Sequence, residues 1–203
     1  MMKVTSKPGN NLLSRQRGVT LVEVIVVMII STLLILISAV GIGTFFRKYK
    51  ELNAWAELQK DGLECLNMIK NGVPVGSGAD MEYYGVTNAL KLQLTGTTTS
   101  SGTGLRITPP TDQGLQTHDF AHFYLYDGAV RCTYVYHGIQ VASPIYVFPK
   151  EDNLENMVVE RFMISKVNLE SEVLAVQVEL NARVKTGTDK DRYIKFKTKM
   201  VKK

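Results

Sequence analysis

Residues 17–23, Arg17-Gly18-Val19-Thr20-Leu21-Val22-Glu23, decide the organisation of this chain, because an uncharged apolar run follows them directly. The run extends from Val24 to Phe46 and contains no Asp, Glu, Lys or Arg. As a helix, its roughly 23 residues reach about 34 Å, which is enough to cross a hydrocarbon core of about 30 Å. A carboxylate at the mouth of such a segment is costly in lipid. We therefore expect Glu23 to meet a positive charge that proteolysis creates close to it.

The segment Gly18-Val19-Thr20-Leu21-Val22-Glu23 resembles the processing site of type IV prepilins and type II secretion pseudopilins, which reads Gly, Phe, Thr, Leu, hydrophobic, Glu. In that family a membrane peptidase cuts after the glycine and methylates the new amino terminus. The resemblance implies cleavage between Gly18 and Val19 and N-methylation of Val19, which stands where Phe or Met is usual. It also implies that Glu23 acts in filament assembly by pairing with the methylated amino terminus of a neighbouring subunit. The similarity covers about residues 15–50.

Two plainer explanations of the apolar run stay open beside this resemblance. The run could be an ordinary signal-anchor helix, with Glu23 near the membrane interface. It could also be a cleaved secretory signal, with Gly41-Ile42-Gly43 as a weak cleavage site. The apolar region of a secretory signal is only about 7–15 residues long, so the length of the run argues against the second explanation.

The net charge of +5 comes mostly from the residues that precede the run. Four of the 24 basic side chains lie before residue 19, where there is no acidic residue: Lys3, Lys7, Arg15 and Arg17. Without these four, 20 basic side chains remain against 19 acidic ones, so the rest of the chain is almost neutral. A basic leader beside an apolar span stays in the cytoplasm, so the rest of the chain is expected on the other side of the membrane. The basicity is therefore poor support for nucleic-acid binding.

The sequence divides into three parts: a leader at 1–18 that is removed, a transmembrane and stalk helix at 19–71, and an extracytoplasmic head at 72–203. After Arg47 apolar residues recur three or four positions apart, which predicts that the helix continues with one apolar stripe. The stripe contains Leu52, Trp55, Leu58, Gly62, Leu66 and Ile69. The helix is expected to end at Asn71-Gly72, because glycine terminates helices readily and Pro74 cannot continue one.

The head is predicted to be rich in antiparallel strands. Its clearest element is a hairpin over 120–137 with a type I′ turn at Asp127-Gly128. This turn pairs Leu125 with Val130, Phe123 with Cys132 and Ala121 with Tyr134 on the core face. Further strands are expected near 89–95, 104–108, 158–169, 173–184 and 192–201, and loops over 72–88 and 95–117. The fold class is α+β, a long helix packed on an antiparallel sheet, which is similar to the lollipop architecture of pilins.

No catalytic or cofactor-binding motif is found in the head, which has no phosphate loop, no zinc-ligand spacing and no nucleophile elbow. We predict no enzyme activity, no cofactor and no metal. His118 and His122 are expected to be surface histidines, because a spacing of four does not bring two side chains together in a strand or loop. The acidic clusters at 151–155 and 189–191 lack a defensible calcium-ligand spacing and are expected to be solvated turns or to cap a helix.

Cys65 and Cys132 both follow the apolar run, so they are expected outside the cytoplasm, where disulfides form. Cys65 borders the apolar stripe of the helix, and Cys132 lies on the core face of the hairpin. Two outcomes stay open: a disulfide, which typically contributes about 2–4 kcal/mol, or two buried thiols that pack as small apolar residues.

The last strand is predicted to point Lys195, Lys197 and Lys199 outward, with Tyr193 and Phe196 assigned to the inward side. Lysines on a terminal strand commonly guard a sheet edge against pairing with other chains. They could also bind an anionic partner, such as DNA, a surface polymer or an acidic subunit, and nothing in the sequence supports DNA in particular.

The resemblance implies a structural subunit of a type IV pilus or type II secretion pseudopilus, and the long head resembles minor pilins and J-type minor pseudopilins. A tip, priming or DNA-uptake role is compatible with it. The implied partners are the prepilin peptidase and methylase, other pilin or pseudopilin subunits, the inner-membrane assembly platform and membrane lipid. The alternative is a single-pass membrane-anchored binding module that never polymerises.

Overall fold

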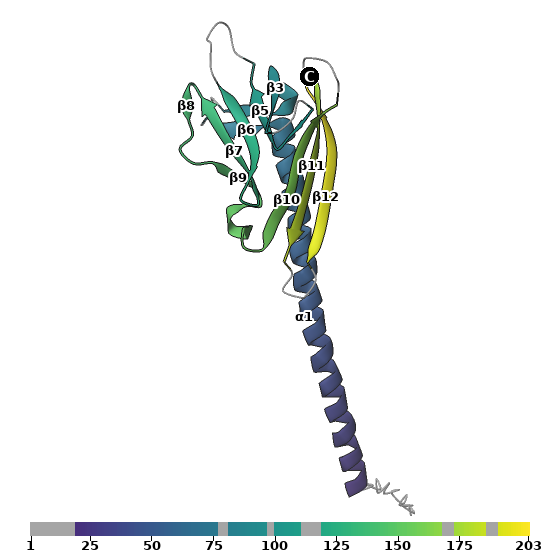
Figure 1. Ribbon diagram of the computed structural model, residues 1–203. Coiled ribbons are helices and arrows are strands. Elements are labelled where there is room, and N and C mark those ends of the chain that lie inside the picture. Colours follow the sequence, from purple (N-terminus) through teal and green to yellow (C-terminus); the bar gives the residue numbers. More distant parts are fainter. Residues whose placement is uncertain (1–18, 77–80, 97–99, 111–118, 168–172, 186–190) are drawn as a thin grey trace, which may run out of the picture. The chain divides into compact units, whose positions relative to one another are not determined.

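The computed structural model describes residues 19–76, 81–96, 100–110, 119–167, 173–185 and 191–203. One helix, α1 (Leu21–Asn71), is followed by two antiparallel sheets and a short hairpin, which confirms the predicted α+β class (Figure 1). The chain forms two compact units, residues 1–47 and 48–203. The second half of α1 therefore belongs to the same unit as the sheets.

Helix α1 ends where the sequence predicted, at the Asn71-Gly72 step. Gly72 has a φ of +111° and donates its backbone N–H to the carbonyl of Met68 at 2.9 Å. A side chain at Gly72 would also collide with the backbone of Tyr83 and Tyr84. The positive φ and the close approach together explain why the helix stops at a glycine.

The first sheet contains four antiparallel strands in the order β12-β11-β10-β4. The long strands are β10 (Met157–Lys166), β11 (Ala175–Val184) and β12 (Arg192–Val201), close to the three predicted ranges. Strand β4 (Ser101–Gly102) pairs with the end of β10, inside a region where we predicted a loop. Among the described residues β12 pairs only with β11, so it forms an edge of this sheet.

The second sheet contains β3 (Lys91–Thr95), β5 (Gly104–Thr108), β6 (Phe120–Tyr126), β7 (Ala129–Tyr136) and β8 (Ile139–Gln140), with β9 (Ile145–Phe148) also paired to β7. The β6–β7 hairpin has the predicted register, including Phe123 opposite Cys132. Both turn residues have positive φ, 52° at Asp127 and 68° at Gly128, as a type I′ turn requires.

The region 72–88 was predicted to be a loop, and this prediction was wrong. It holds the antiparallel pair β1 (Val73–Val75) and β2 (Glu82–Tyr84), followed by the 3₁₀ helix η2 (Val86–Asn88). A second 3₁₀ helix, η3 (Glu151–Asn153), precedes β10. Val73, Val75, Tyr84 and Val86 are all buried in the core. These short elements close the core near the end of α1.

The core of the head lies between the second half of α1 and the two sheets. Leu58, Cys65, Leu66 and Ile69 of the helix pack in one cluster with inward residues of both sheets. The predicted stripe is correct from Leu58 onward, but Leu52 is 59% exposed and Trp55 is 37% exposed. At this level of the helix the buried residue is Glu51 and not Leu52, and Glu51 is ion-paired.

Candidate functional site: the amino-terminal helix and its contacts with the head

The start of α1 is closed by a capping box between Thr20 and Glu23. The Thr20 backbone N–H and hydroxyl donate to the Glu23 carboxylate at 2.8 and 3.0 Å, and the Glu23 N–H donates to the Thr20 hydroxyl at 3.3 Å. This reciprocal arrangement satisfies donors that a helix start otherwise leaves unpaired. This capping box was not predicted, although the Thr-x-x-Glu spacing is a known signal for it. Gly18 lies outside the described residues.

The capping box holds the Glu23 carboxylate at the amino-terminal end of the helix, close in sequence to Val19. Val19 is 72% exposed and Leu21 is 77% exposed. An acidic group at a helix start is also favoured by the helix dipole. The arrangement explains how a carboxylate is held beside the apolar run, and it leaves the surface around Val19 open.

The apolar run of α1 is uncovered along its whole length. Residues 21–47 include no buried residue, and an 18-residue window of the helix has a mean hydropathy of 2.9, so the helix is apolar enough to cross a membrane. The hydroxyls of Thr32, Ser38 and Thr44 each donate to the carbonyl four residues earlier, at 2.8–2.9 Å. Because no water is available in lipid, polar groups there must be satisfied within the helix, and these three are.

The second half of α1 is tied to the head by two sets of ionic contacts. In the first, the Glu51 carboxylate accepts from Arg192 of β12 at 2.8 and 3.0 Å and from Lys48 at 2.9 Å. The hydrogen bond from Lys48, followed by that from Arg192, holds the pKa of Glu51 below its ordinary value. A buried carboxylate is therefore kept ionised between two cations.

The second set joins the β9–β10 connection to the helix. The Lys150 ammonium lies 2.9 Å from a carboxylate oxygen of Glu64 and 3.7 Å from one of Asp61, and these contacts raise its pKa. Asn153 donates to Glu57 and Asp61 at 3.2 and 3.4 Å. Three helix acids on one side therefore share one ammonium and one amide group.

Gly62 lets strand β12 approach the helix backbone. A Cβ atom at this position would overlap the ring of Phe196, which packs against the core cluster. Glycine in a helix interior costs about 1 kcal/mol relative to alanine. The close contact with an aromatic ring explains why glycine is present.

Cys65 and Cys132 are both fully buried in the core, and each is a free thiol in the structure. Burial raises the pKa of both, that of Cys132 to about 12. At neutral pH they are therefore protonated and behave as small apolar residues. The disulfide between them stays a prediction.

The three lysines of β12 point outward as predicted, and the other face of the strand carries Phe196 and Met200 inward. Tyr193 is 63% exposed on the lysine side, so its inward assignment was wrong. Lys195 pairs with Glu179 of β11 at 3.1 Å, and Arg161 lies 3.9 Å from the same carboxylate. The lysine face is thus partly neutralised by its own sheet, which favours the edge-guarding role.

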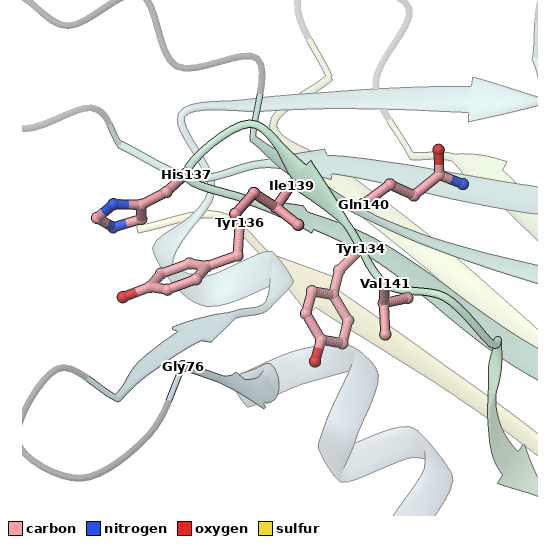
Figure 2. A pocket seen from close by; sticks show the side chains of 7 residues that line it. All are labelled: Gly76, Tyr134, Tyr136, His137, Ile139, Gln140 and Val141. Carbon is pink, nitrogen blue, oxygen red and sulfur yellow. The ribbon is translucent and has the colours of Figure 1, made fainter.

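The head also has an aromatic groove beside the β7–β8 turn. Figure 2 shows Tyr134 and Tyr136 on the same side of β7, with the His137 ring next to Tyr136. Gly76, Ile139, Gln140 and Val141 complete a lining that encloses about 530 Å³. Asp119 fixes the turn by accepting from the backbone N–H groups of His137 and Gly138 at 2.9 and 3.0 Å.

His122 is half-buried, stacks on Tyr124 and contacts the Thr95 hydroxyl at 2.8 Å, while His118 lies outside the described residues. Burial lowers the pKa of His122. In the described parts of the chain, no group of three His, Cys, Asp or Glu side chains is arranged to hold a metal. In the acidic cluster at 189–191, the Asp191 carboxylate forms an ion pair with the Arg183 guanidinium at 2.7 Å.

Residues 13–39 match the family model of the prokaryotic N-terminal methylation motif. The chain carries a prepilin-type amino terminus. The match supports membership of the type IV pilin and pseudopilin family, whose members are structural subunits, and processing by a prepilin peptidase. With the single long apolar helix, it fits a membrane-anchored pilin. No curated protein and no solved structure matches the chain.

Proposed function

We propose that this pilin-type chain is a minor pilin or pseudopilin subunit that is cut between Gly18 and Val19 and methylated on Val19. The observation that carries the proposal is the prepilin-type motif directly before an apolar half-helix that no described part of the chain covers. Such a surface is stable only in lipid or against other apolar helices. In this proposal the helix passes from the cytoplasmic membrane into a type IV pilus or a type II secretion pseudopilus.

Glu23 sets the axial position of the subunit in the proposed filament. Cleavage would create an amine at Val19, and Glu23 would pair with the methylated amine of a neighbouring subunit inside an apolar bundle. The capping box supports this role, because it holds the carboxylate toward the amino-terminal end of the helix. The pairing would exchange a hydrogen bond from Thr20 for one from a cation, and charge-assisted hydrogen bonds are stronger than neutral ones.

The head would then present its sheets outside the filament core. The proposed partners are the prepilin peptidase, other subunits and the inner-membrane assembly platform, and the head is the part that distinguishes this subunit from others. The partial neutralisation of Lys195 by Glu179 gives no support to a DNA-uptake role. Such a role would require salt-dependent DNA binding that is lost when Lys195, Lys197 and Lys199 are replaced by Gln.

The test is the mass of the amino-terminal peptide of the membrane-purified chain, with and without a co-expressed prepilin peptidase. We expect a peptide that begins at Val19 and carries one extra methyl group only when the peptidase is present. The matched control is Gly18→Val, in which the β-branched side chain should prevent cleavage while leaving membrane insertion unchanged. A peptide that still begins in the leader in every sample would overturn the proposal and favour the non-polymerising anchored module.

A further inference from the structure

Arg131 lies on the face of β7 that points away from the core. Its neighbour on β6 is Tyr124, and its neighbour on β9 is Tyr146. The guanidinium carbon is 4.7 Å from the ring centre of Tyr126 and 4.5 Å from that of Tyr146. The two rings come from strands on either side of β7, and such contacts are favourable for a cation. The guanidinium is therefore held in one place before any ligand arrives.

The same guanidinium has no acceptor in the described parts of the chain. Its Nε–H is fully enclosed and makes no hydrogen bond. None of the ion pairs between described residues includes Arg131. The arginines of the other sheet are different, because Arg161, Arg183 and Arg192 each lie within 4 Å of a carboxylate oxygen. A partly buried cation without an acceptor is costly, so its presence calls for an explanation.

A pocket of about 490 Å³ adjoins Arg131. Ser143 and Tyr146, which carry hydroxyl groups, line it, and Glu151 is the acidic side chain among its described lining residues. Since Nε is enclosed, the terminal nitrogens of Arg131 are the donors left for a ligand. A carboxylate accepts two parallel N–H groups from a guanidinium. The negative charge of Glu151 repels a dianion more strongly than a monoanion, so a singly charged carboxylate fits better than a phosphate.

We propose that this pocket binds a carboxylate presented by an acidic side chain of another protein, with Arg131 as the anchoring residue. Tyrosine and arginine dominate the binding energy of protein interfaces, particularly where they are well packed and preorganised. Arg131 between Tyr126 and Tyr146 is such a cluster, and Tyr126 is 59% exposed beside it. The proposal concerns the head unit and does not depend on filament assembly.

The test uses the full chain in detergent micelles, with ¹⁵N-labelled arginine, and follows the Nε–H resonance of Arg131 by NMR. An enclosed Nε–H exchanges slowly with water and is therefore observable, and Arg131→Lys assigns it. Sodium acetate replaces sodium chloride at constant ionic strength, and inorganic phosphate and a glutamate-rich peptide are titrated in parallel, with a glutamine-rich peptide as control. Arg106 is the internal control, because it stacks on Phe120 at 3.8 Å but does not line the pocket.

We expect a saturable shift of the Arg131 resonance with acetate and with the glutamate-rich peptide, and no saturable shift of Arg106. Ser143→Asp, at an exposed position, should place a resident carboxylate in the pocket, move the Arg131 resonance by itself and weaken acetate binding about tenfold. Equal responses of both arginines, no response at all, or stronger binding of phosphate than of acetate would each overturn the proposal.

Discussion

Between Val24 and Phe46 helix α1 contains no buried residue, whereas between Glu51 and Ile69 it contributes seven: Glu51, Leu58, Asp61, Gly62, Cys65, Leu66 and Ile69. Burial of an apolar side chain is worth about 1.5–3 kcal/mol, and the second stretch gains this from the sheets of its own chain. The first stretch can gain it only from lipid or from other chains. One continuous helix thus depends on its own fold at one end and on its surroundings at the other.

The polar groups of the two stretches differ in the same way. In the first, the hydroxyls of Thr32, Ser38 and Thr44 bond to the helix itself. In the second, Glu51, Asp61 and Glu64 take partners from the head. These hydroxyls of the first stretch therefore need no tertiary partner, whereas the three carboxylates of the second make tertiary contacts. Glu23 is the exception, since it has both an internal bond and a proposed partner from another chain.

The largest effect is expected for Glu23→Gln, which removes the charge but keeps the size of the side chain and an oxygen that can cap the helix. Loss of one member of a buried ion pair costs about 3–5 kcal/mol. Most incorporation into filaments should therefore be lost, measured by immunoblot of sheared filaments against the membrane fraction. Cleavage at Gly18 should continue, as the mass of the amino-terminal peptide will show.

Glu57→Gln in the second stretch is the control for this substitution, because Glu57 is exposed and bonds only to Asn153 among the described residues. It should incorporate normally. Incorporation of Glu23→Gln at the wild-type level would contradict the ionic pairing and leave the capping box as the role of Glu23.

The next effect is expected for Leu58→Ala, which should lower the free energy of unfolding of the head by about 2–5 kcal/mol, since Leu58 is completely buried. Leu63→Ala, on the exposed side of the same stretch, should change it by no more than about 0.5 kcal/mol. Urea unfolding in detergent, followed by the fluorescence of the single tryptophan Trp55, measures both. Equal effects of the two substitutions would show that the sheets do not cover this face of α1.

A smaller loss, about 1–3 kcal/mol, is expected for Gly62→Ala, because the new methyl group meets the Phe196 ring. Alanine is the better helix former, so a gain in stability would be expected if the ring were not there. The double substitution Gly62→Ala with Phe196→Leu should lose less than the sum of the single ones. Strict additivity in the same urea experiment would contradict the contact.

Much of this fold could be predicted where local signals and a long pattern agree. The Asp127-Gly128 turn determined the register of β6 and β7, and the alternation of apolar and polar residues located β10, β11 and β12, although β10 has a register shift between Val159 and Arg161. Gly72 ended the helix as expected. In each case residues close together in the sequence specify the structure, either through a turn or helix end that requires a positive φ or through apolar side chains at every second position.

The missed strands are too short for a pattern. Strands β1, β2 and β4 have two or three residues each: β1 and β2 pair with each other, and β4 pairs with the distant strand β10. The exposure of Leu52 and Trp55 likewise follows from where the sheets end. In the candidate site the prepilin-type motif was recognisable, whereas the contacts of Glu51 and Arg131 were not, because Arg192 and Tyr146 come from distant strands.

The smallest effect is expected for Glu51→Gln, because its partners Lys48 and Arg192 are more than half exposed to solvent, and the effect depends on pH. The pKa of Glu51 is lowered in the folded chain by Lys48 and Arg192, so the unfolded chain binds the proton more readily. The stabilisation by the carboxylate is therefore present above the unfolded pKa of about 4.3 and is lost as the pH falls through the folded value. The urea midpoint of Glu51→Gln should lie below that of the wild type at neutral pH, and the two should converge at acidic pH, where Glu51 of the folded wild type is protonated. Glu155→Gln, in the exposed turn before β10, should match the wild type at both pH values. A constant difference between wild type and Glu51→Gln across this range would mean that Glu51 stabilises the second stretch of α1 by packing rather than by its charge.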